Sequence, residues 1–287
     1  MKRLLTFAAL LWSAMGMAQT AVSFEKIFFE THSREQKYNI QGASIAGGKL
    51  FQLHDGNKPI VVYDMKNGAF VSEIEVEPTK TWHNNTAQFS DFYYEKGDAY
   101  PLLYVSQENI KEHKAVVHRI TADKDGILTS EIIQTIVFPE PIEMGLYYPN
   151  LALDLDAGFL YLTGFSWASW NKPDRCNAVQ ILRFRLPSPK EGPVVKLWTK
   201  DILERYCTDF KVATQGATIY GGKLYQVFGG PGNSCLVCTD LSTGEELFKS
   251  ELNGIPGEPE GLGIYKGRLI VSCNDGDVYR SDLDVTK

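Results

Sequence analysis

Polar and aromatic side chains that could bind a ligand recur along the chain at the ends of short apolar segments. Amide groups both donate and accept hydrogen bonds, and carboxylates accept them from hydroxyls. Aromatic faces cover the apolar faces of sugar rings. This mixture predicts a site for a carbohydrate-like or other polar small ligand, such as a glycan. The predicted ligand-binding residues are Gln41, His54, Trp82, His83, Asn84, Tyr147, Tyr148, Asn150, Trp167, Gln215 and Glu260.

Some of these residues have an alternative structural role. Gln41 and Gln215 could satisfy backbone groups inside the fold, because buried polar groups need hydrogen-bond partners. Trp167 could pack a long insertion instead of facing a ligand. We expect His113 and His118 to lie on the surface, beside a solvated strand.

The candidates for catalysis are Glu143, Glu260 and His83. Two carboxyl groups about 5–9 Å apart can cleave a glycosidic bond, and a histidine can act as a general base. The sequence contains no nucleophile elbow, no paired-histidine zinc motif and no P-loop. Oxygen ligands that converge could hold Ca²⁺, but the residues predict no firm cofactor. An enzyme, a glycoside hydrolase or lyase, is therefore an alternative to a binding protein.

The cysteines favour no metal or redox site. There are five, so at least one is left over from any set of intrachain disulfides. Cys235 and Cys238 have the C-x-x-C spacing, but they lie in a predicted strand, where residues three apart face opposite sides. Cys176 and Cys207 form the most plausible disulfide, and burial as small apolar residues is the alternative for most of the five.

The first residues are typical of an export signal. Lys2 and Arg3 precede a mostly apolar run, and small residues at Gly16 and Ala18 match a cleavage site after Ala18. The alternative is a buried N-terminal helix. The run is too short for a typical membrane span, and no second run of that length follows. We therefore expect residues 1–18 to be a signal peptide and residues 19–287 to be a single domain, periplasmic or secreted.

The composition restricts the partners. The net charge is −6, whereas nucleic-acid binding needs a basic surface. We therefore expect no nucleic-acid partner and no membrane insertion, and we expect a monomer that binds a small polar ligand or a glycan.

The elements that must position these residues are repeated. The segment 41–52 returns at 215–226 with nine of twelve positions identical, and a weaker copy begins at Glu260. A shorter element, Leu followed by an aromatic or aliphatic residue, recurs about every 55 residues. Five such units fill the chain, and each contains turn signals between short strand patterns. The sequence predicts an all-β fold, a five-bladed β-propeller, with six shorter blades as the alternative. The five leucines are Leu50, Leu103, Leu160, Leu224 and Leu269.

The predicted strands also indicate how the ring closes. The fifth unit ends after three strands, and the alternating segment 22–30 can supply the missing fourth one, which would cover two exposed sheet edges. A short helix is expected over 201–206. The strands expected in the first and fifth units are 41–46, 49–54, 59–63, 70–76, 261–265, 268–273 and 278–281.

Two sets of loops meet at one end of a propeller axis: those that link blades and those between the second and third strand of each blade. The first set brings Gln41, His83 and Glu260 to this end, and the second brings the segments 54–55 and 107–109. Because loops on a rigid scaffold concentrate function, we expect the ligand site on this axial rim. A protein-interaction scaffold that uses the blade faces is a third hypothesis.

The repeats resemble secreted bacterial five-bladed propellers. The Gln-Gly-Ala opening at Gln41 and the segment 258–262 resemble the propellers that include phage receptor-binding and teichoic-acid-related domains, which implies recognition of a cell-surface glycan or polyol phosphate. Glu260-Gly-Leu is also similar to an element of the glutamine cyclotransferase propellers. That resemblance implies cyclisation of N-terminal glutamine with Glu260 as the acid. Here Gln41-Gly and Gln215-Gly stand where that group repeats Glu-Gly, so two titratable groups are absent.

Overall fold

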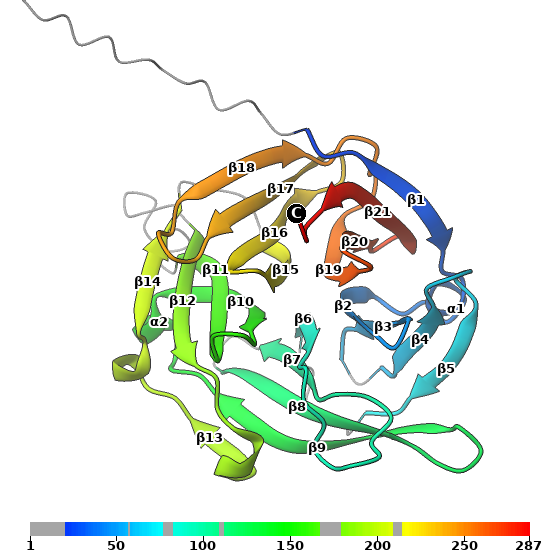
Figure 1. The fold of residues 1–287 in the computed structure, drawn as a ribbon, viewed down its shortest axis with the longest axis horizontal. Coiled ribbons are helices and arrows are strands. Elements are labelled where there is room, and N and C mark those ends of the chain that lie inside the picture. The colour runs from blue at the N-terminus through cyan, green and yellow to red at the C-terminus, as the bar shows by residue number, and fades with distance from the viewer. Residues whose placement is uncertain (1–20, 57, 77–82, 109–111, 167–178, 209–213) are drawn as a thin grey trace, which may run out of the picture.

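The five-unit repeat forms five sheets around a central axis. The computed structural model describes residues 21–56, 58–76, 83–108, 112–166, 179–208 and 214–287. Each sheet has its first strand near the axis and its last strand at the periphery (Figure 1). The chain is a five-bladed β-propeller, and the six-bladed alternative is wrong.

The first two blades follow directly from the strand patterns in the sequence. The predicted bounds of the first blade agree with the structure to within two residues, and the strand at 49–54 agrees at both ends. Blade 1 consists of β2 (Ile40–Ala46), β3 (Lys49–His54), β4 (Ile60–Asp64) and β5 (Phe70–Ile74). Blade 2 consists of β6 (His83–Phe89), β7 (Leu103–Glu108), β8 (His113–Ala122) and β9 (Leu128–Val137).

The remaining blades keep the same antiparallel order. Blade 3 consists of β10 (Leu146–Asp154), β11 (Phe159–Ser166), β12 (Val179–Arg185) and β14 (Glu204–Cys207). Blade 4 consists of β15 (Thr214–Tyr220), β16 (Lys223–Gly230), β17 (Asn233–Asp240) and β18 (Glu246–Glu251). Blade 5 contains β19 (Pro259–Tyr265), β20 (Arg268–Cys273) and β21 (Asp277–Asp284), and its outermost strand is β1 (Phe24–Phe29).

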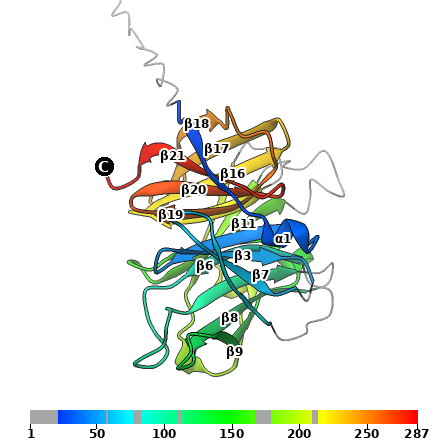
Figure 2. The same ribbon diagram turned by 90° about the vertical axis from the view of Figure 1, so that its right-hand side faces the viewer.

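The N-terminal strand closes the ring, as predicted. β1 pairs antiparallel with β21, so the two ends of the described chain share one blade (Figures 1 and 2). This pairing removes two exposed edges that could otherwise template aggregation. After β1, the short helix α1 (His32–Glu35) leads into blade 1.

The repeated Leu-aromatic element joins neighbouring blades. Adjacent residues of a strand point to opposite faces of the sheet. In blade 1, Leu50 therefore packs in the cluster shared with blade 5, and Phe51 packs in the cluster shared with blade 2. The other four copies, Leu103–Tyr104, Leu160–Tyr161, Leu224–Tyr225 and Leu269–Ile270, divide between successive clusters in the same way. The repeat thus exists because every blade must contact two others.

Small residues let the inner strands approach one another. A Cβ atom placed on Gly42 would lie 2.8 Å from the backbone oxygen of Asn85, and one on Gly216 would lie 2.7 Å from the backbone nitrogen of Leu262. Such distances are too short for a side chain, so glycine is required where β2 meets β6 and where β15 meets β19.

Blade 3 departs from the sequence prediction. The helix expected over 201–206 is wrong: a 3₁₀ turn covers Thr199–Asp201, and β14 follows as the outer strand of the blade. Pairing of β14 with β12 outweighs the local helical signal. The chain between β12 and β14 also adds β13 (Val194–Lys196) to blade 2, parallel to β9. This exchange ties blades 2 and 3 together.

Two surface predictions are also wrong. His113 and His118 lie on β8, which pairs with β7 on one side and β9 on the other, and both side chains are buried. Burial lowers the pKa of each imidazole to about 4, so both are neutral at pH 7. In contrast, the strand placement of Cys235 and Cys238 is confirmed: they pack on opposite faces of β17.

Burial raises the pKa of both of these thiols, to about 11 for Cys238, which is opposite to what a reactive cysteine needs. Cys176 and residues 1–20 lie outside the described residues, so the disulfide with Cys207 and the signal peptide stay predictions. No helix in the described part of the chain has both the length and the apolar character needed to cross a bilayer.

Candidate functional site

Five polar residues lie at or near the register shifts of the five inner strands. They are Gln41, Asn85, Asn150, Gln215 and Glu260, four amides and one carboxylic acid. Every inner strand shifts its pairing register close to this residue. Such bulges re-aim side chains at the rims of β structures. All five residues are buried or half-buried, so they form one polar layer and not a solvated surface.

Three of the amides join neighbouring blades. Asn85 Nδ2 donates to the carbonyl oxygen of Pro149 at 3.0 Å, and Asn150 Nδ2 donates to Thr214 Oγ1 at 2.6 Å. Gln215 Nε2 donates to Glu258 Oε1 at 2.7 Å. These bonds give the amides partners at the boundaries of blades 2 to 5. Gln215 Nε2 also donates to the carbonyl oxygen of Gly229 at 3.4 Å, a backbone group of the kind that the structural alternative named.

Gln41 and Glu260 differ from the other three. Among the described residues, neither the Gln41 amide nor the Glu260 carboxyl group has a side-chain hydrogen-bond partner, although each residue is only 6% exposed. They come from blades 1 and 5, which are neighbours in the ring because β2 contacts β19. Neither residue contributes an atom to the described set of fully buried side-chain polar atoms that lack a partner, so their polar atoms keep contact with solvent and are open to a ligand.

Glu260 is neutral at pH 7. Burial raises the pKa of its carboxyl group to about 9, and the negative charges of Glu258 and Asp55 add to the shift. A neutral carboxylic acid has one O–H donor and keeps acceptor capacity. Glu260 therefore offers both kinds of hydrogen bond at the axis.

A second buried acid lies across the cluster at the end of β7. Burial raises the pKa of Glu108 to about 8, while the charge of His83 and hydrogen bonds from Asn85 and from the Tyr148 N–H lower it. Asp55 raises the pKa of Glu108 as well as that of Glu260, so it lies within electrostatic reach of both acids. These groups act as one cluster.

Asp55 holds a histidine beside these acids. His83 Nδ1 lies 2.7 Å from Asp55 Oδ1, and both side chains are partly exposed. Burial alone would lower the pKa of His83, but the hydrogen bond and the charge of Asp55 outweigh it, so the pKa is raised. The pair resembles an oriented acid–base group.

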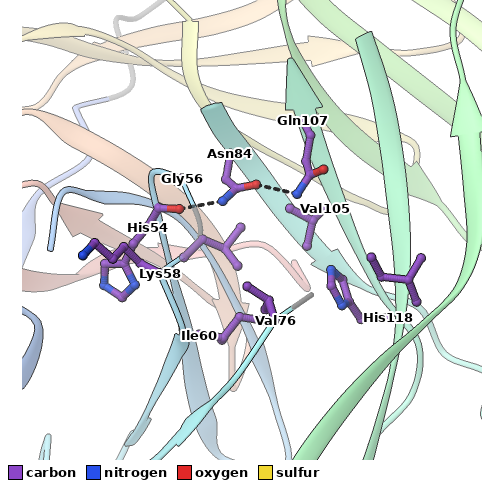
Figure 3. A pocket seen from close by; sticks show the side chains of 11 residues that line it. His54, Gly56, Lys58, Ile60, Val76, Asn84, Val105, Gln107 and His118 are labelled. Carbon is purple, nitrogen blue, oxygen red and sulfur yellow. Dashed lines mark hydrogen bonds between the residues drawn. The ribbon is translucent and has the colours of Figure 1, made fainter. Parts of the chain in front are cut away.

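Two of the predicted ligand-binding residues serve the packing of blades 1 and 2. His54 is fully buried: its Nδ1 lies 2.8 Å from the carbonyl oxygen of Pro59 and its Nε2 lies 2.9 Å from Ser33 Oγ. Asn84 donates to the carbonyl oxygen of His54 at 2.5 Å and accepts a bond from Gln107 at 2.8 Å (Figure 3). The cavity beside them measures about 20 Å³, which is room for about one water molecule.

The two tyrosines among the predicted ligand-binding residues differ in exposure. Tyr147 is buried, with its ring 6.0 Å from that of His113, whereas the adjacent Tyr148 is exposed. Burial raises the pKa of both phenols, and the charge of Glu108 raises it further. Trp82 and Trp167 lie outside the described residues.

Glu143 is exposed on the helix α2 (Pro141–Met144). The groups whose charge raises the pKa of Glu260 after burial are Glu258 and Asp55. In the described part of the chain, no group of three or more His, Cys, Asp or Glu side chains is arranged to hold a metal ion. Ca²⁺ on the axis therefore gains no support from these residues.

Sequence reasoning placed Asp55, Glu108 and Glu258 at this rim but did not keep them among the final candidates for ligand binding or catalysis. The available signal was positional, because Asp55 follows β3 and Glu108 ends β7, at the end of the second strand in two successive blades. Their coupling to Glu260 depends on blade packing, which has no local signature.

Comparison with known proteins supports the fold. No family model and no curated protein matches the chain. Glutaminyl cyclase from Myxococcus xanthus has a similar structure with a TM-score of 0.53 and 11% identity, over 92% of this chain and 97% of that one. Virginiamycin B lyase from Staphylococcus aureus reaches a TM-score of 0.47 at 12% identity, over 91% and 99%.

A third structure, hydrazine synthase from Kuenenia stuttgartiensis, has a TM-score of 0.43 at 11% identity, over 82% of this chain. This chain spans 61% of that protein. At these identities the likeness shows the propeller fold alone. The comparisons give no support to a resemblance to phage receptor-binding propellers.

Proposed function

We propose that the protein binds a small polyhydroxylated ligand, a carbohydrate or a close analogue, at the axial cluster. The observation that carries the proposal is the pair Gln41 and Glu260, two buried polar groups without side-chain partners in the described structure. A hydroxyl both donates and accepts, which matches an amide beside a protonated acid. The amides of the other blades are already bonded and hold the site rigid.

The charge of the cluster restricts the ligand. Asp55 and Glu258 act on Glu260 as negative charges, and like charge repels an anion. A polyol phosphate is therefore disfavoured relative to a neutral sugar. The Asp55–His83 pair adds a donor at the exposed side of the cluster.

Isothermal titration calorimetry of residues 19–287 against neutral mono- and disaccharides tests this proposal. Replacing Glu260 by Ala or Gln41 by Ala removes one hydrogen-bonding group, so affinity for the saccharide that binds should fall about tenfold. Glu143→Gln and Gln36→Ala are matched controls, because both side chains are exposed and away from the cluster. Binding that survives both axial substitutions would place the saccharide site elsewhere.

Acid–base catalysis on the same scaffold is the second candidate. It is favoured by the neutral carboxyl group of Glu260 and by the fold shared with a glutaminyl cyclase. In the cyclisation of an N-terminal glutamine, the α-amine attacks the side-chain amide carbon and a C–N bond forms. The former amide C–N bond breaks, ammonia leaves with a proton from Glu260, and the attacking amine returns a proton to the acid.

Release of ammonia from a glutaminyl dipeptide, with loss of the same mass from the peptide, tests this candidate. The Glu260→Gln variant should abolish release and Glu143→Gln should retain it. Release by both variants would exclude Glu260 as the acid, and no release by the unchanged protein would exclude the reaction.

We propose that the protein functions outside the cytoplasm as a monomer. The basic and apolar residues before Ala18 support export. Fractionation of producing cells and sequencing of the mature N-terminus should give an exported chain that begins at Gln19, and light scattering should give the mass of one chain. A cytoplasmic chain that starts at Met1 would refute the export proposal.

A further inference from the structure

Tyr148 has a backbone conformation that its residue type disfavours. Its φ is 52°, in the left-handed region, where the side chain crowds the following carbonyl oxygen. Pro149 comes next, and a residue before proline favours an extended conformation. The other non-glycine residues of positive φ in the described chain, Lys37 and Lys266, follow a helix and occupy a hairpin turn. Tyr148 instead lies within strand β10, and such strain is often associated with function.

The strain is located in a β-bulge. Tyr148 and Pro149 together lie opposite Gly164 of β11. In bulges whose first residue is left-handed, that residue is normally glycine. Here the glycine is on the partner strand, where any Cβ atom would collide with the carbonyl oxygens of Tyr147 and Tyr148. The strand pair thus makes room for the bulge while a large aromatic residue keeps the strained position.

The neighbouring blade contacts this bulge. Asn85 Nδ2 donates to the carbonyl oxygen of Pro149, the residue after Tyr148, at 3.0 Å. The buried acid Glu108, only 4% exposed, is in the same blade as Asn85. Its carboxyl group is on β7, and blades 2 and 3 are therefore linked at this point.

The result is a fixed, exposed aromatic ring beside the axial cluster. Tyr148 is the one exposed residue of β10, at 38%, and its ring centroid lies 5.8 Å from that of Tyr147. The ring of Phe165 meets it edge-on at 6.4 Å. An aromatic surface that is already ordered loses little conformational freedom when a ligand stacks on it.

We propose that Tyr148 is a specificity-determining residue that stacks on the apolar face of a saccharide ring. The inference rests on the proposed function of the axial cluster. It narrows the ligand class to saccharides in ring form. A pyranose presents a rigid C–H face to Tyr148 together with hydroxyls for Gln41 and Glu260, whereas an acyclic polyol presents hydroxyls without such a face.

Matched cyclic and acyclic ligands separate ring stacking from hydrogen bonding. Calorimetry with methyl glucoside, galactoside and mannoside is compared with sorbitol, galactitol and mannitol. The unchanged protein should bind at least one pyranoside up to about tenfold more tightly than its alditol. Tyr148→Phe keeps the ring and should keep this preference. Tyr148→Asn, a residue that tolerates the left-handed conformation, should remove the preference and leave alditol affinity unchanged.

A fold defect would weaken pyranosides and alditols alike, so the ratio of the two affinities reports Tyr148 specifically. Preference for pyranosides that is retained in Tyr148→Asn would overturn the stacking role. If the unchanged protein binds none of the six compounds, the proposed function fails and this inference fails with it.

Discussion

The buried acid Glu260 should destabilise the folded protein at neutral pH, and Glu260→Gln should relieve this. The pKa of Glu260 is raised from its ordinary value of 4.5 to about 9, chiefly by burial. Between these values the folded chain binds a proton that the unfolded chain has released. Stability therefore falls as pH rises through this window, by about 1.4 kcal/mol per pH unit.

From pH 5 to pH 7 this loss amounts to about 3 kcal/mol. Little solvent screening reduces the figure, because only 6% of the residue is exposed. Glutamine has nearly the same shape and no charge in either state, so the variant should gain about 3 kcal/mol relative to the unchanged protein over these two pH units.

Urea denaturation of both proteins at pH 5, 6 and 7 measures the effect. The difference in free energy of unfolding should grow steadily with pH. Glu143→Gln is the matched control, because an exposed carboxylate is hydrated in both states, and its difference should stay constant. A difference for Glu260→Gln that is equal at pH 5 and pH 7 would refute the assignment of a neutral, buried acid at the axis.

Three further perturbations test the rest of the structure. Asp55→Asn removes the hydrogen-bonded charge that raises the pKa of His83, so the imidazole should titrate at lower pH in an NMR titration; an unchanged titration would contradict the pair. Burial lowers the pKa of His118 from 6.5 to about 4. The unfolded state therefore binds more protons below about pH 6.5, and the folded protein loses stability as pH falls towards 4. In thermal melts, His118→Gln should lose less stability than the unchanged protein between pH 6.5 and 4.5. Gly42→Ala should destabilise the protein by about 1–3 kcal/mol, because its Cβ would meet backbone atoms of the next inner strand. Gly230→Ala is the control and should change stability by less, because its Cβ would have its nearest contact at 3.8 Å. Equal effects in urea melts would show that the inner strands can move apart.

The arrangement of blades could be predicted because each blade must contact two neighbours. Leu50 and Phe51 point to opposite faces of one strand and enter two different clusters, and the same requirement recurs in every blade. The Leu-aromatic element therefore recurs in the sequence once per blade. The incomplete last unit and the alternating segment near Phe24 predicted ring closure for a similar reason, since an unpaired edge needs a partner.

The site could be predicted only in part. Gln41 and Glu260 were found because they occupy equivalent places in the repeat. The burial of His113 and His118 was missed, because one strand between two others is covered by residues distant in sequence. The burial of His54 was missed for the same reason, because its partner Ser33 lies between the ring-closing strand and blade 1.

The sequence by itself determined the all-β class, the five blades, the closure of the ring and the strands of the first blade, because alternation and repetition are local properties of a strand. The tertiary structure alone decided the protonation of Glu260 and Glu108 and the strained display of Tyr148. Those properties arise from the burial, charge and close backbone contacts that neighbouring blades impose on one another, and no short stretch of sequence contains both partners.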